Sequence, residues 1–194
     1  MKGIVVLVCF SVLTIPAFAE GISRQSGDKS LNFSFNDFAV EDYKYGIGGK
    51  YWLSHVTAMN LSINLGKSEQ DSESTSGGPP VTSGSDSKSY SFSVGVEKHF
   101  SSKTTLSPYY GGEVFYMHTD SDYSDSSESS SKAWGINALL GAEYPINKGV
   151  SLAAEYAYGY YKTKTESSTP ITNSTTTGSG YREYSSKLIL LLYF

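Results

Sequence analysis

Four carboxylates lie close together in one Ser-rich segment, between residues 120 and 128. Carboxylate oxygens are ligands that hard divalent cations prefer, but the segment lacks the glycine and the spacing of an EF-hand loop. His55 and His118 have no partner at the spacing of a zinc site. We therefore predict no metal or other cofactor, and we interpret the segment as a solvated acidic loop that carries Asp120, Asp122, Asp125 and Glu128.

A second set of charged residues falls within segments that alternate between polar and apolar residues. Alternation with a period of two indicates strands with one apolar face. A hairpin pattern recurs in "GGKYWLSHVTAM" (48–59), "GVEKHFSSKTTL" (95–106) and "GAEYPINKGVSL" (141–152), and it sets the phase of the flanking strands. In that phase one row of the sheet is apolar, and the other row carries Lys50, Glu97, Glu113, Glu143, Glu155 and Lys187.

The elements that position these charges are eight predicted strands. Short turns alternate with three low-complexity segments at 67–88, 119–132 and 164–180, which we expect to be long loops because they cannot bury a core. A repeated hairpin with such spacing predicts an all-β, antiparallel, up-and-down barrel. The predicted strands are 30–38, 44–53, 56–66, 88–100, 104–118, 132–146, 149–163 and 181–194.

The first 19 residues have the pattern of a secretory signal peptide. Lys2 precedes an apolar run that is too short to span a membrane as a helix, and Ala17 and Ala19 form the cleavage box. The mature chain, 20–194, is then one domain without cysteine, because Cys9 lies in the leader. The formal net charge of −4 argues against a nucleic-acid binder.

Alternation does not by itself tell which row of the barrel faces inward. Long loops at one end, together with an apolar last residue, favour a transmembrane barrel whose apolar row faces lipid. Eight strands leave an interior just wide enough for side chains, so the charged row must pair or be neutralised. We therefore expect no open pore, and we expect a glutamate to be protonated or to receive a hydrogen bond from Tyr109 or Tyr161.

The chain ends on "KLILLLYF", its most apolar stretch after the leader. A free terminus gains nothing from apolar residues in water, so an apolar environment must receive this end. Both faces of the segment are apolar near its end, and we take its phase from the final phenylalanine. If the last strand closes against the first, the residues that face lipid are Leu188, Leu190, Leu192 and Phe194.

Together, the leader, the eight strands and the terminal Phe194 resemble the small outer-membrane β-barrel family of the OmpA transmembrane and OmpX type. The hairpins "GVEKHFSSKTTLSPYYGGEVFY" and "GAEYPINKGVSLAAEYAYGYY" carry the same resemblance. It implies the outer membrane of a Gram-negative bacterium, with outer-membrane lipid and lipopolysaccharide as partners. It also implies that the barrel-assembly machinery reads the last strand, with Leu188, Leu190, Leu192 and Phe194 as its signal.

Some barrels of this size deacylate or acylate lipid A, and the deacylase type carries a His-x-Ser pair on its lipid-facing wall. His99-Phe100-Ser101 has that spacing, but Lys98 and Ser102 depart from the arginine and asparagine of the type. His99 also falls in the inward row. We interpret the protein as non-enzymatic, with a structural or surface-interaction role and a host or environmental ligand for its loops. The alternatives are a lipid A-modifying enzyme, a small-pore or transport barrel and a soluble secreted barrel.

Overall fold

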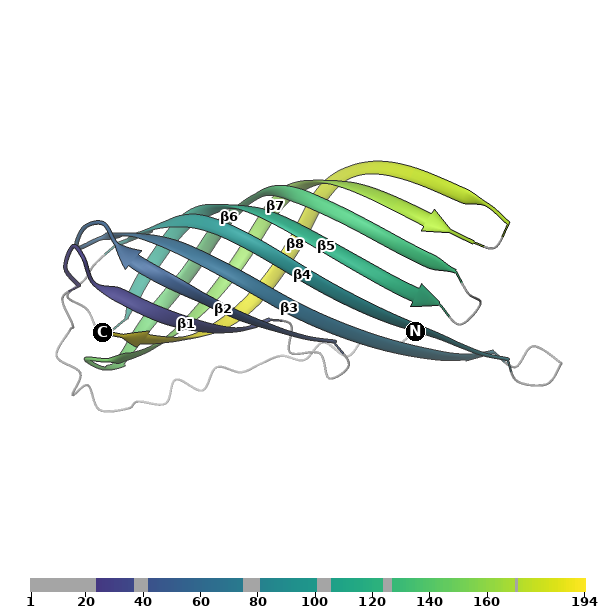
Figure 1. Ribbon diagram of the computed structural model, residues 1–194. Helices are drawn as coiled ribbons and strands as arrows, with labels where there is room; N and C mark the ends of the chain where they lie inside the picture. Colours follow the sequence, from purple (N-terminus) through teal and green to yellow (C-terminus); the bar gives the residue numbers. More distant parts are fainter. Residues whose placement is uncertain (1–23, 37–41, 75–80, 101–105, 124–126, 170) are drawn as a thin grey trace, which may run out of the picture.

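Eight antiparallel strands form a closed barrel in which each strand pairs with the next and β8 pairs with β1 (Figure 1). The computed structural model describes residues 24–36, 42–74, 81–100, 106–123, 127–169 and 171–194. The predicted signal peptide with Ala17 and Ala19 lies outside the described residues. No helix in the described ranges is long and apolar enough to cross a membrane.

The strands differ greatly in length. The first two are short, and the other six continue well beyond them toward one end of the barrel (Figure 1). The C-terminus lies at the opposite end, where the turns between strands are short. The strands are β1 (Lys29–Asn36), β2 (Asp42–Trp52), β3 (Thr57–Ser74), β4 (Val81–His99), β5 (Ser107–Tyr123), β6 (Glu128–Asn147), β7 (Val150–Ser168) and β8 (Asn173–Tyr193).

The exposed face of the barrel is apolar, and its interior is mostly polar or small, with a few large side chains such as Trp52 and Tyr109. Along β7, Ser151, Ala153 and Glu155 are buried, whereas Leu152 and Tyr156 between and beyond them are exposed. Other strands repeat this arrangement, because successive side chains of a strand point to opposite faces. A water-soluble barrel has the reverse distribution, so this surface is suited to lipid. The exposed set includes Leu61, Leu65, Phe92, Val114, Ile136 and Leu140.

The three low-complexity segments are largely strand rather than irregular loop. The hairpin of β3 and β4 stays in register from Thr57↔Lys98 out to Ser74↔Val81, well past the predicted strand end at residue 66. The other two long hairpins likewise continue to Tyr123 and Glu128, and to Ser168 and Asn173. The sequence predicted long irregular loops at 67–88, 119–132 and 164–180, whereas the described parts of these segments are mostly β-strand. We call the three extensions the outer ribbons.

Hydrogen bonds explain why a sequence without an apolar face remains a strand in the outer ribbons. A β-ladder is made by backbone groups, which do not depend on the polarity of the side chains. Hydroxyl pairs add contacts between strands, as at Ser87 and Ser121 (2.7 Å) and at Ser131 and Thr163 (3.1 Å). Cross-strand hydroxyl pairs of this kind stabilise a sheet without needing a core.

The last strand closes the barrel with its alternate residues in opposite environments. β8 pairs with β1 from Ser30↔Tyr193 to Asn36↔Lys187, and the amide of Phe194 donates to the carbonyl of Lys29 (3.2 Å). Leu191 is fully buried and packs against Tyr109 and Ala153 in the interior. With Leu191 inside, the alternation of the strand places Leu188, Leu190, Leu192 and Phe194 on the outward row, of which Leu192 is 36% and Phe194 83% exposed.

Candidate functional site

Six charged side chains meet inside the half of the barrel that has the short turns. Each comes from a different strand: Lys50 from β2, Glu97 from β4, Glu113 from β5, Glu143 from β6, Glu155 from β7 and Lys187 from β8. The four glutamates and Lys50 are each less than a tenth exposed. They meet because every one of them occupies an inward position of its strand, as the alternation predicts. We call the groups they form, with their partners, the lumen network.

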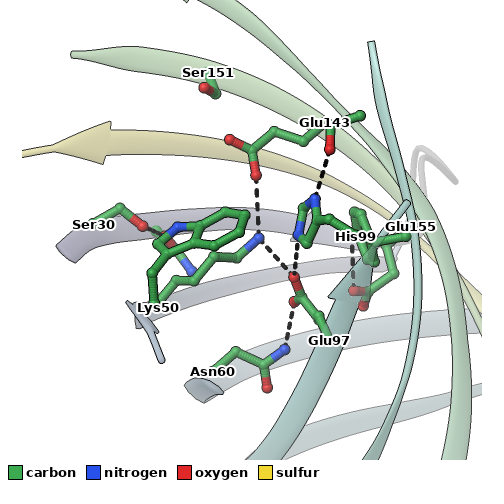
Figure 2. Close-up of polar contacts among 12 residues, drawn as sticks. Ser30, Lys50, Asn60, Glu97, His99, Glu143, Ser151 and Glu155 are labelled. Atoms are coloured by element: carbon green, nitrogen blue, oxygen red, sulfur yellow. Dashed lines mark hydrogen bonds and ion pairs between the residues drawn. The ribbon is translucent and has the colours of Figure 1, made fainter. Parts of the chain in front are cut away.

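Lys50 is the centre of the first part of the lumen network (Figure 2). Its Nζ lies 2.7 Å from Glu97 and 3.3 Å from Glu143. Arg24 lies on the other side of Glu143, with Nη2 3.3 Å from its carboxylate. Uncharged side chains also donate hydrogen bonds to both carboxylates: Asn60 donates to Glu97 (2.5 Å), and the Tyr193 hydroxyl donates to Glu143 (2.8 Å).

Lys187 is the centre of the second part. Its Nζ lies 3.1 Å from Glu155 and 3.5 Å from Glu113. The Tyr109 hydroxyl donates to Glu155 (3.1 Å), and the Asn137 amide donates to Glu113 (2.8 Å). The expected hydroxyl partner from Tyr109 is therefore present. The hydroxyl of Tyr161, the other residue considered for that role, lies beside Gly180 instead. Each buried charge thus has both a counter-ion and a hydrogen bond, which burial of charge requires.

Aromatic rings pack around the first part of the lumen network. The His99 ring lies between Trp52 and Tyr109, with centroids 4.6 and 4.9 Å away. The Tyr109 ring in turn covers Gly141, where a Cβ atom would collide with it, so a glycine is needed at this position. Lys50 Nζ lies 5.2 Å from the centre of the Tyr109 ring, a cation–π distance. These contacts leave little space across the barrel at this level.

His99 belongs to the lumen and not to the lipid-facing wall. It is 2% exposed, its Nδ1 lies 2.8 Å from the Ser107 hydroxyl, and its Nε2 lies 3.4 Å from Glu97. Ser101, the other half of the His-x-Ser pair, lies outside the described residues. The histidine therefore faces away from the acyl chains on which a lipid A deacylase would act.

Arg24 is the member of the lumen network that the sequence analysis missed. It lies five residues before β1, where there is no alternation to assign it to a face. Its guanidinium lies 3.3 Å from the centre of the Tyr193 ring and also donates to Ser151 (2.8 Å). The excess of four glutamates over two lysines on the inward row was the signal that another cation was needed. Asn60 and Asn137 lie on inward rows whose phase the hairpin repeat supplies, and the inward position of Tyr193 follows from the phase taken from Phe194.

A cavity of about 40 Å³ remains between the two parts of the lumen network. Its lining includes Lys50, Asn60 and Glu97 from the first part, and Glu113, Glu155 and Lys187 from the second. That volume suits one or a few water molecules and not a hydrated solute. The described lumen is thus filled by paired side chains at this level.

The acidic segment near the barrel's outer end does not form a metal site in the described part of the chain. Asp120, Asp122 and Glu128 line a solvent-open hollow of about 550 Å³ between the ribbons. Asp125 lies outside the described residues, and no three acidic, histidine or cysteine side chains among the described ones are grouped to hold a metal ion. His118 contacts Asp120 (3.0 Å), and His55 is exposed at the β2–β3 turn.

An eight-stranded barrel with apolar residues on its outer face and charged residues in its lumen is typical of outer-membrane β-barrel proteins. The chain belongs to the outer membrane protein beta-barrel domain family, whose model matches residues 5–182. This membership places the protein in the outer membrane of a Gram-negative bacterium. No curated protein sequence matches the chain.

Solved structures with low sequence identity share the fold. The outer membrane protein OprG from Pseudomonas aeruginosa is similar with a TM-score of 0.66 and 16% identity, over 89% of this chain and 99% of that one. Neisserial surface protein A is similar with a TM-score of 0.54 and 18% identity, over 86% and 95%. A major outer membrane protein from Thermus thermophilus gives 0.55 and 12%, over 86% and 99%. At such identities the likeness concerns the fold alone.

Substitution of Lys50 tests whether the lumen network stabilises the barrel. Lys50→Met leaves Glu97 without its cation and Glu143 with only Arg24. Breaking a buried pair costs about 3–5 kcal/mol, so we expect urea unfolding of the protein in lipid vesicles at a clearly lower urea concentration. The double variant Lys50→Met/Glu97→Gln should recover much of the loss. Lys98→Met, at an exposed position, is the control, and equal midpoints for Lys50→Met and Lys98→Met would contradict the account.

Proposed function

We propose that this protein is a closed outer-membrane anchor that presents three polar β-ribbons at the cell surface, with a structural or surface-interaction role. The observation that carries the proposal is the filled lumen. Ion pairs from six strands meet across the interior, and the space between them holds no more than a few waters. A barrel filled in this way serves as a stable support better than as a route for solutes.

The outer ribbons are the surface that such an anchor would offer. In outer-membrane barrels the short turns face the periplasm and the long connections face outward. Here the long connections are paired strands with serine and threonine along both faces, as in β8 from Asn173 to Gly180. Large aromatic anchors, on which tight and specific interfaces rely, are few there. This composition favours hydration and shielding of the surface, or weak contacts with a host or environmental ligand.

His99 suggests lipid A modification as an alternative function, but the position of its ring in the lumen argues against it. A residue that acts on acyl chains must reach the lipid-facing wall, whereas the His99 ring is enclosed by Trp52 and Tyr109. Its two nitrogens are engaged by Ser107 and Glu97. The placement supports a packing role in the lumen network, so we propose no enzymatic activity.

Conductance measurements test the closed lumen. In planar bilayers the purified protein should give no current steps of porin size, because its eight strands enclose paired side chains and not a water column. A porin of 16 strands reconstituted in the same lipid is the positive control. Repeated steps of porin size from the heat-modifiable, folded fraction would refute the proposal.

Cysteine labelling tests the orientation of the ribbons. The only cysteine, Cys9, lies in the predicted leader, so single variants can be labelled specifically. We expect a membrane-impermeant maleimide to label Ser174→Cys, in the β8 ribbon, on intact cells. Lys148→Cys, in the short β6–β7 turn, should be labelled only after the outer membrane is permeabilised. The opposite pattern would show that the ribbons face the periplasm.

A further inference from the structure

The closed barrel has one joint between strands that no turn connects. The other neighbouring strands follow each other in the chain, so a covalent connection keeps each of them beside its partner. The pair of β1 and β8 joins the two ends of the sheet and depends on non-covalent contacts alone. Its ladder, from Ser30↔Tyr193 to Asn36↔Lys187, is also the shortest of the described ladders. We call this joint the seam, and it is the place where the barrel opens most easily.

A short segment before β1 is fixed to β2 on one side of the seam. We call residues 24–28 the strap. The Gly27 amide donates to the Trp52 carbonyl (2.8 Å), and the Trp52 amide donates to the Asp28 carbonyl (2.9 Å). The strap turns at Gly27, whose φ of 97° lies in the left-handed region that favours glycine. The Gln25 amide donates to the Asp28 carboxylate (2.8 Å) across this turn. The strap is therefore held on the side of the seam that β1 and β2 form.

The side chain of Arg24, at the start of the strap, reaches the strands on the other side of the seam. Its guanidinium donates to Ser151 on β7 (2.8 Å) and to Glu143 on β6 (3.3 Å). It also lies 3.3 Å from the centre of the Tyr193 ring on β8. One arginine can make all three contacts because the guanidinium is planar, carries five N–H groups and stacks on aromatic rings. Arg24 is 6% exposed, so it is bound to these three strands with little access of water.

Neutralisation of Glu143 does not account for all the contacts of Arg24. Lys50 already lies 3.3 Å from that carboxylate, and the Tyr193 hydroxyl donates to it. The bond to Ser151 and the contact with the Tyr193 ring compensate no charge, but they join the strap to the last two strands. Trp52 on β2 adds a contact across the seam, because its indole N–H donates to the Tyr193 hydroxyl (3.4 Å). These contacts connect the two ends of the sheet.

We propose that Arg24 is a latch that docks after the barrel has closed and then keeps the seam closed. Its partners lie on β6, β7 and β8, so they come within reach of the strap only when β8 has paired with β1. A contact that forms after the main barrier to folding slows opening and does not accelerate closure. The latch goes beyond the proposed anchor role, because it concerns how long the barrel stays closed and not what the outer ribbons contact.

Amide hydrogen exchange of the protein in lipid nanodiscs tests the latch, because it reports the local opening of each ladder. We compare amides that bond across the seam with amides that bond between β4 and β5. Arg24→Met should accelerate exchange at the seam about tenfold, as loss of a hydrogen bond to a charged group predicts, and leave the β4–β5 ladder unchanged. Arg24→Lys keeps the charge without the planar group and should give a smaller acceleration. Equal acceleration in both ladders, or none at the seam, would overturn the proposal.

A matched control removes a hydrogen bond to another buried glutamate. Asn137 on β6 donates to Glu113 on β5, and a hairpin connects these two strands. Asn137→Ala should leave exchange at the seam as it is in the wild-type protein. Acceleration at the seam as large as that of Arg24→Met would show a general loss of stability and would overturn the latch.

A disulfide across the seam provides the decisive comparison. Leu31 and Leu192 are opposite each other in the seam ladder and both are exposed, so Leu31→Cys/Leu192→Cys leaves the lumen unchanged. The natural cysteine, Cys9, lies in the predicted leader. After oxidation of the folded protein, Arg24→Met should no longer accelerate exchange at the seam, and reduction should restore the acceleration. An acceleration that persists in the oxidised protein would show that Arg24 acts elsewhere and that the seam needs no latch.

Discussion

The pairing of buried carboxylates with buried cations is the interaction on which this structure depends. Because side chains alternate in direction along a strand, the two neighbours of a residue that faces lipid point into the barrel. Here the inward neighbours include Glu97, Glu143 and Glu155, and an unpaired carboxylate in a narrow lumen would be very costly. Lys50, Lys187 and Arg24 meet that requirement, each within 3.5 Å of a carboxylate. The apolar exterior is possible only because the interior is neutralised in this way.

The same alternation gives the barrel three zones along its length. Around the lumen network the interior is packed and the exterior is apolar, which suits a permanent place in the bilayer. At the edge of the apolar band nearest the outer ribbons, the outward-facing residues are first aromatic and then basic, as at Trp134 and Lys132. Beyond this edge the outer ribbons are polar on both faces, and backbone ladders with cross-strand hydroxyl pairs hold their strands together. The proposed anchor corresponds to the first of these zones, and the proposed surface display corresponds to the last.

Alternation in the sequence was enough to predict the eight strands, their order and which residues point inward, because a period of two and the hairpin repeat define the phase. It could not predict that Lys50 on β2 meets Glu143 on β6, since contacts across the lumen depend on the stagger of the closed barrel. Arg24 was missed because it precedes the first strand and so has no assigned face. The outer ribbons were misjudged because segments such as 67–74 lack the apolar alternation by which strands are recognised.

Neighbouring leucines provide the most direct test of the claim that the apolar row faces lipid. Leu139 is 2% exposed and Leu140 is 65% exposed, and Leu191 and Leu192 form a second such pair. In lipid nanodiscs, methyl NMR spectra should show cross-relaxation from acyl-chain methylenes to Leu140 and Leu192, and not to Leu139 and Leu191. Lipid contacts at Leu139 and Leu191, with Leu140 and Leu192 packed together inside, would contradict the account.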